Sequence, residues 1–165
     1  MSNYTTIRSS SQLREGDHIS WPTQELGGML SHHAIVVAVL GGDKFSVVHV
    51  SRTGRDGQTK SSAADSLSLD GNPDSHEVCE CTKDLGEWVR NKELCRYDYE
   101  STECYEPAEV IENARSKIGK FAYNLLTDNC EHFARWCKTG KYVSYQAHVP
   151  QRVINAVEII EEYID

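Results

Sequence analysis

Residues 127–136 read Thr-Asp-Asn-Cys-Glu-His-Phe-Ala-Arg-Trp and predict a helix that starts with a cysteine in its first turn. Asp128 and Asn129 are favourable N-caps, because their side-chain oxygens can accept hydrogen bonds from the free N–H groups of a first turn. The following apolar residues are spaced i, i+3, i+4, i+7, which predicts one buried face: Cys130, Phe133, Ala134 and Cys137. We expect Gly140 to end the helix and the opposite face to be exposed: Glu131, Arg135 and Lys138.

A thiol at the start of a helix has unusual chemistry. The positive end of the helix dipole favours the thiolate, which lowers the pKa of the thiol, and the thiolate is the nucleophile. Cys130 is therefore a candidate nucleophile. The alternative is a small, buried and chemically inert cysteine.

A second informative stretch carries two histidines. Residues 32–40 are almost wholly apolar after His32 and His33, which predicts a buried strand. Gly41–Lys44 predicts a turn. Residues 45–50 predict the returning strand of a hairpin.

The hairpin brings two histidines to one face of a sheet. Symmetric antiparallel pairing sets Val36 opposite His49, so that His32 and His49 point to the same side. The remaining offset of four residues is about 13 Å, too long for a hydrogen bond, and we expect a bulge or an asymmetric turn to shorten it. A thiol enzyme needs a base and a group that orients the base. His32 is the candidate base and His49 the candidate orienting residue, unless His49 is only a half-buried strand histidine.

The other histidines and the Cys79-x-Cys81 pair receive structural interpretations. His33 should face the other side of the sheet from His32, and His132 should point away from the nucleophile. His18, His76 and His148 have no evident partner. Because no second Cys/His pair stands at zinc spacing, we expect strand alternation at Cys79 and Cys81, no metal and no cofactor.

The rest of the chain predicts one α+β domain. We expect residues 1–12 to be a flexible tail and residues 13–165 a single domain with a long surface loop near residues 52–76. Further predicted elements are strands at Glu77–Thr82, Gly86–Arg90, Leu94–Tyr99 and Phe121–Leu126, a helix from Pro107 to Gly119 with Ile118 on its inner face, and a helix from about Gln151.

Composition limits the partners. The net charge of −8 argues against nucleic acid, since phosphates require a basic surface. The N-terminal residues lack an apolar signal region, so we expect six reduced cysteines and a cytoplasmic protein that meets membranes transiently. The sequence does not indicate an oligomeric state.

The cysteine motif Asn129–Phe133 resembles the signature of the H-box/NC proteins, which include lecithin–retinol acyltransferase and the HRAS-like-suppressor phospholipase A/acyltransferases. Gly16–Ile19, followed by residues 32–36 and Val47–His49, is similar to their histidine box. The resemblance implies a circularly permuted papain-like (NlpC-type) fold, in which an antiparallel sheet packs on the helix of the nucleophile.

The same resemblance implies the chemistry. Cys130 would accept a fatty acyl group from a glycerophospholipid as a thioester, with His32 as base and His49 orienting it. The backbone N–H of Cys130 could stabilise the oxyanion. Water, an amine or an alcohol would then receive the acyl group. Two alternatives share the cysteine helix: a catalytically silent H-box/NC module that binds partners, and a thiol peptidase or amidase.

Overall fold

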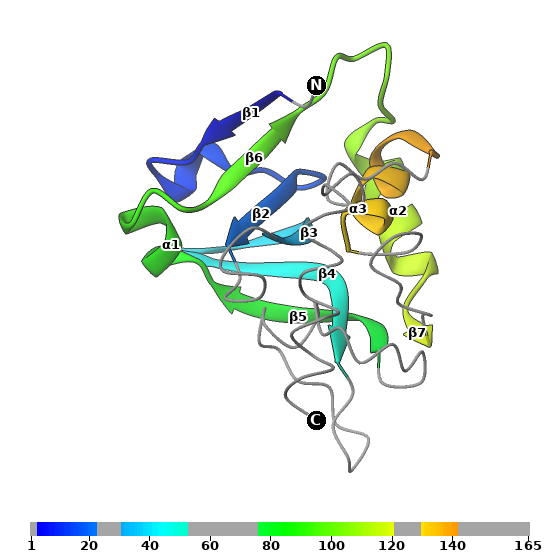
Figure 1. The fold of residues 1–165 in the computed structure, drawn as a ribbon, viewed down its shortest axis with the longest axis horizontal. Helices are drawn as coiled ribbons and strands as arrows, with labels where there is room; N and C mark the ends of the chain where they lie inside the picture. The colour runs from blue at the N-terminus through cyan, green and yellow to red at the C-terminus, as the bar shows by residue number, and fades with distance from the viewer. Residues whose placement is uncertain (1–2, 23–30, 53–75, 121–129, 142–165) are drawn as a thin grey trace, which may run out of the picture.

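The computed structural model describes residues 3–22, 31–52, 76–120 and 130–141, which form an antiparallel sheet with helices beside it (Figure 1). The sheet has seven strands in the order β1-β6-β2-β3-β4-β5-β7. The strands are β1 (Asn3–Thr6), β2 (His18–Pro22), β3 (Ser31–Gly41), β4 (Lys44–Arg52), β5 (His76–Asp84), β6 (Cys95–Asp98) and β7 (Gly119–Lys120). The predicted α+β class is confirmed.

A short 3₁₀ helix and three α-helices complete the described residues: η1 (Ser10–Gln12), α1 (Gly86–Arg90), α2 (Pro107–Ser116) and α3 (Cys130–Thr139). Pro107 occupies the favoured first position of α2, as predicted. Gly140, with φ of 77°, follows α3 in the left-handed conformation that commonly ends helices. None of the described helices is both long enough and apolar enough to cross a bilayer.

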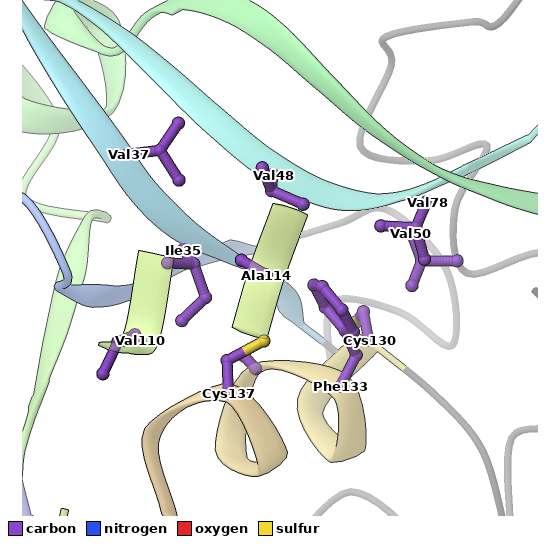
Figure 2. Close-up of a cluster of buried hydrophobic side chains, with 11 residues drawn as sticks. Ile35, Val37, Val48, Val50, Val78, Val110, Ala114, Cys130, Phe133 and Cys137 are labelled. Carbon is purple, nitrogen blue, oxygen red and sulfur yellow. The ribbon is translucent and has the colours of Figure 1, made fainter. Parts of the chain in front are cut away.

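Helices α2 and α3 cover one face of the sheet. Along β3 and β4, side chains alternate between two core clusters, as the pleat of a strand requires. The cluster beneath the helices is drawn in Figure 2, with the side chains of α3 pointing at those of the strands. It contains Ile35, Val37, Val48, Val50, Val78, Val110, Ala114, Cys130, Phe133, Ala134 and Cys137. The four α3 residues predicted to be buried are therefore all in the core.

The second cluster lies on the opposite face. It contains Ile7, Leu13, Ile19, Trp21, Ala34, Val36, Phe45, Val47, Leu85 and Leu94. Ile7, which follows β1, is fully buried, and its N–H donates to the Leu94 carbonyl at 2.8 Å. β1 pairs along its whole length with β6. For residues 3–12 the prediction of a flexible tail is wrong, because Ile7 is buried in the core and β1 is paired with β6.

Three predictions about the helices also need correction. Gly86–Arg90 is helix α1, in which the Val89 N–H donates to the Leu85 carbonyl at 3.0 Å, and it lies between β5 and β6 in the chain. α2 ends at Ser116, and Ile118 beyond it is 48% exposed. The predicted caps Asp128 and Asn129, the strand Phe121–Leu126, the helix from Gln151 and nearly all of the loop at 52–76 lie outside the described residues.

Two of the three α3 residues predicted to be exposed, Glu131 and Arg135, are buried, and the third, Lys138, is half-buried. Glu131 and Arg135 are 2% and 8% exposed and form an ion pair at 2.8 Å between Arg135 Nε and Glu131 Oε2. Arg135 Nη1 also donates to the Tyr99 hydroxyl at 3.2 Å, and Tyr99 bonds to His18 Nδ1 at 2.8 Å. The helix therefore contacts the sheet through charge as well as through apolar packing, which the amphipathic pattern does not reveal.

The polar connection ends at a buried histidine pair. His18 Nε2 and His33 Nδ1 are 2.7 Å apart, and both rings are excluded from solvent. Burial lowers the pKa of His33 to about 4 and lowers that of His18 well below its ordinary value. Both imidazoles are therefore neutral at pH 7, and protonating either one opposes the fold.

We predict that Ile7→Ala lowers the free energy of unfolding by about 2–5 kcal/mol, the cost of truncating a buried aliphatic side chain. Urea unfolding monitored by circular dichroism measures it. Tyr4→Ala, on the same strand but 61% exposed, is the control and should cost less than about 1 kcal/mol. If Ile7→Ala left the free energy of unfolding unchanged, the N-terminal segment would be a flexible tail after all.

We also predict acid destabilisation through His33. The pKa of His33 is about 6.5 in the unfolded chain and about 4 in the folded chain. The folded state therefore has its full stability above pH 6.5 and loses stability as the pH falls towards 4. The loss for His33 is on the order of 3 kcal/mol. Urea unfolding at a series of pH values should show a flatter dependence for His33→Gln than for the native chain. Equal slopes between pH 6.5 and 4.5 would contradict the burial of a neutral His33.

Candidate active site

His32 and His49 lie together in the core beneath β3 and β4. His32 Nε2 is 2.8 Å from His49 Nδ1, and the rings meet edge to face with centroids 4.8 Å apart. Both residues are fully buried, and the Trp21 ring packs on His32 at 4.8 Å. The predicted proximity of the two histidines is confirmed, and His49 is buried completely.

The strand register explains this proximity. Ala34, rather than Val36, pairs with His49, and the register shifts between Val36 and Ala38. Val37 is the extra residue of this bulge. A further shift, between Val39 and Gly41, brings the total to two residues relative to symmetric pairing. The offset between His32 and His49 falls from four residues to two, which is within reach of two imidazoles.

Burial and a histidine neighbour keep His32 neutral. Burial lowers the pKa of His32 well below its ordinary value, and the neighbouring His49 lowers it further. His32 is therefore neutral at pH 7 and has one nitrogen able to accept a proton. Since each neutral ring has one N–H, His32 Nδ1 and His49 Nε2 must play opposite roles: when one accepts, the other donates.

Cys130 is the first residue of α3 and is fully buried. Its thiol lies 3.6 Å from the carbonyl oxygen of Ser31, at the end of β3. Ser31 directly precedes His32 in the chain. The structure therefore places the predicted nucleophile at the strand end that carries the predicted base.

The two side chains nevertheless belong to different core clusters. Alternation along β3 directs His33, with Ile35, towards α3, and directs His32, with Ala34, towards the other face. The neighbours of Cys130 on α3 act on His33: Glu131 raises its pKa and Arg135 lowers it, although burial has the larger effect. His33 faces away from His32, as predicted, and is a second histidine on the side of the cysteine helix.

Two further cysteines meet His49 from β5. Cys81 Sγ is 3.0 Å from His49 Nε2, and Cys79 Sγ is 3.6 Å from the same nitrogen. A hydrogen bond from Cys79, and a second from His49, lower the pKa of Cys81 to about 4, while the pKa of Cys79 is raised by the contact with Cys81 and by burial. Both thiols lie on one face of β5, as the predicted strand alternation requires. Because Cys79 is paired directly with His49 on β4, the imidazole lies on that same face.

Sequence reasoning missed these cysteines as partners of His49, and it missed the His18–His33 pair. The spacing of Cys79 and Cys81 along the chain predicts strand alternation and, because no second Cys/His pair stands at zinc spacing, gives no reason to expect His49 as a partner. The available signal was the strand order: once β5 is placed beside β4, parity puts Cys79, Cys81 and His49 on one face. The contact of His18 with His33 could be found only from the pairing of β2 with β3. In that pairing Ser20 lies opposite His33, so His18, two residues from Ser20, is on the same face as His33.

Comparison with known proteins gives the family. The model of the lecithin retinol acyltransferase family matches residues 11–143. The human protein "Phospholipase A and acyltransferase 1" is 39% identical over 76 residues, 44% of each chain. The mouse protein "Lecithin retinol acyltransferase" is 38% identical over 52 residues, 32% of this chain and 21% of its own. The alignments thus span less than half the length of these curated relatives. Since the family model covers most of the described residues, the chain belongs to the lecithin retinol acyltransferase family.

Proposed function

We propose that this protein is a thiol-dependent lipid acyltransferase or phospholipase A1/A2 with Cys130 as nucleophile. The Cys130 thiolate attacks the ester carbonyl of a glycerophospholipid, the ester C–O bond breaks, and the lysophospholipid leaves as an alcohol after taking a proton. The acyl group stays on sulfur as a thioester. Water, an amine or an alcohol then attacks the thioester and restores the thiol.

One observation carries this proposal: the Cys130 thiol contacts the carbonyl of Ser31, and the next residue in the chain is His32, which is paired with His49. The neutral His32 can take the thiol proton, and His49 Nδ1 can accept a hydrogen bond from the imidazolium that results. In the proposed mechanism the backbone N–H of Cys130, in the first turn of α3, donates to the oxyanion of the tetrahedral intermediate.

Family membership supports the same chemistry, since the relatives carry the names of a phospholipase A and acyltransferase and of a lecithin retinol acyltransferase. The proposal includes the circularly permuted papain-like (NlpC-type) arrangement of sheet and cysteine helix. It also includes a cytoplasmic location with transient contact at a membrane surface, where an acyl lipid would be met.

A catalytically silent interaction module is the second candidate. It is favoured by the complete burial of Cys130 and by the position of His32 and Cys130 in different core clusters. In that case the thiol would serve only as packing volume. The two functions differ in one measurable respect, which is whether sulfur 130 forms a covalent acyl intermediate.

We predict that incubation with mixed phospholipid vesicles adds the mass of one fatty acyl group to the native chain, as seen by intact mass spectrometry. Cys130→Ala should abolish the adduct, and His32→Ala should slow its formation by about 100-fold or more, the usual effect of removing a general base. Cys137→Ala is the matched control, because Cys137 is buried on the same face of α3. It should still form the adduct.

The variants also separate the alternatives. An adduct on the Cys130→Ala chain would remove Cys130 from the mechanism, and no adduct on a folded native chain would favour the interaction module. Loss of acylation in His33→Ala with retention in His32→Ala would transfer the role of base to His33. Cleavage of an activated amide without reaction with lipid ester would indicate a peptidase or amidase.

A further inference from the structure

We propose that His49, Cys79 and Cys81 form a binding site for a soft divalent metal ion, with Zn²⁺ as the best match. The three residues offer one imidazole nitrogen and two sulfurs, and these ligand atoms all lie within 4.8 Å of one another. His49 comes from β4 and both cysteines from β5, so that the ladder between these strands holds the three donors in place.

The spacing of the donors matches a tetrahedral ion. Zinc bonds of about 2.0–2.1 Å to nitrogen and about 2.3 Å to sulfur place N and S roughly 3.5 Å apart across the metal. The observed separations from His49 Nε2 are 3.0 Å to Cys81 Sγ and 3.6 Å to Cys79 Sγ. A shift of Cys81 by about half an ångström makes room for the ion.

The donor set also selects the kind of ion. Two thiolates and an imidazole are ligands that zinc prefers, whereas magnesium and calcium require oxygen donors. Zn²⁺ binds both cysteines as thiolates and leaves the fourth position for a water molecule, so a cysteine that is still protonated releases its proton to solvent. Both cysteines are only half-buried, which leaves the sulfurs open to an ion from solvent, while the fully buried His49 is fixed by its bond to His32.

Metal binding would fix the protons of the histidine pair. An ion on His49 Nε2 requires the proton on Nδ1, which then donates to His32 Nε2. The remaining nitrogen of His32 must carry its own proton and can accept none. If the proposed function is correct, on which this step rests, zinc therefore inhibits acylation of Cys130 by removing the acceptor from the base.

The binding test uses the full chain with Cys130→Ala, in reducing buffer, so that its result is independent of catalysis. Zn²⁺ titration followed by native mass spectrometry should give one ion per chain, and Co²⁺ should show sulfur-to-cobalt charge-transfer absorption. Cys79→Ser and Cys81→Ser should each raise the Kd by more than about 10-fold. Cys95→Ser is the matched control, since Cys95 is a half-buried strand cysteine on β6, and its Kd should not change.

Two results would overturn the site. One is the absence of stoichiometric zinc binding by the folded chain, and the other is an equal effect of Cys79→Ser and Cys95→Ser. The inhibition is tested separately, as the ratio of acylation rates with and without Zn²⁺ in each protein that carries Cys130. That ratio should be about 0.1 or less in the native chain and near one in Cys79→Ser. A native ratio near one, with zinc bound, would reject the inhibition alone.

Discussion

The two register shifts between β3 and β4, at Val36/Ala38 and at Val39/Gly41, are the constraint on which the histidine geometry depends. β3 carries adjacent histidines, so alternation buries one imidazole on each face of the sheet. A buried polar ring is costly unless it is hydrogen-bonded, and each ring finds an imidazole on a neighbouring strand. His33 meets His18 of β2, and His32 meets His49 of β4. Only the second pairing requires the two register shifts, which bring Ala34 rather than Val36 opposite His49.

Much of the architecture follows from the sequence because apolar periodicity decides it. The β3–β4 hairpin, the strand at Glu77–Thr82 and the buried stripe of α3 are each specified by several residues that agree with one another. β1 and α1 depend on long-range contacts: β1 on its pairing with β6 and the bond from Ile7 to Leu94, and α1 on the Leu85 N–H that donates to the Asp43 carbonyl at 2.9 Å. Such contacts leave no local pattern, and so a tail and a strand were predicted in their place.

The candidate site divides in the same way. Residue parity was sufficient to put His32 and His49 on one face, and a bulge or an asymmetric turn was expected, but the positions of the two register shifts could not be read from a run of valines. The buried charge on α3 was missed for a different reason. Glu131 and Arg135 neutralise each other and reach Tyr99, so a face that looks solvated along the helix becomes an internal polar contact. Strand order, which no local pattern contains, was also needed to place Cys79 and Cys81 beside His49.

The two histidine pairs differ in where their protons lie, and this bears on which ring can act as a base. Arg135 can only donate, so its bond to Tyr99 directs the tyrosine hydrogen towards His18 Nδ1. His18 then donates from Nε2 to His33 Nδ1, and His33 keeps its proton on Nε2. His33 therefore presents a donor, although it lies on the side of the cysteine helix.

The His32–His49 pair has a different terminus. It ends at the sulfur of Cys81, whose lowered pKa favours a thiolate that accepts from His49 Nε2, so His49 Nδ1 accepts from His32 Nε2. In this arrangement His32 Nδ1 is a proton acceptor, as a catalytic base must be. On this argument the ring of His32 suits the chemistry better than that of His33. The Cys130 proton would then have to pass around the end of β3, where the sulfur already contacts Ser31.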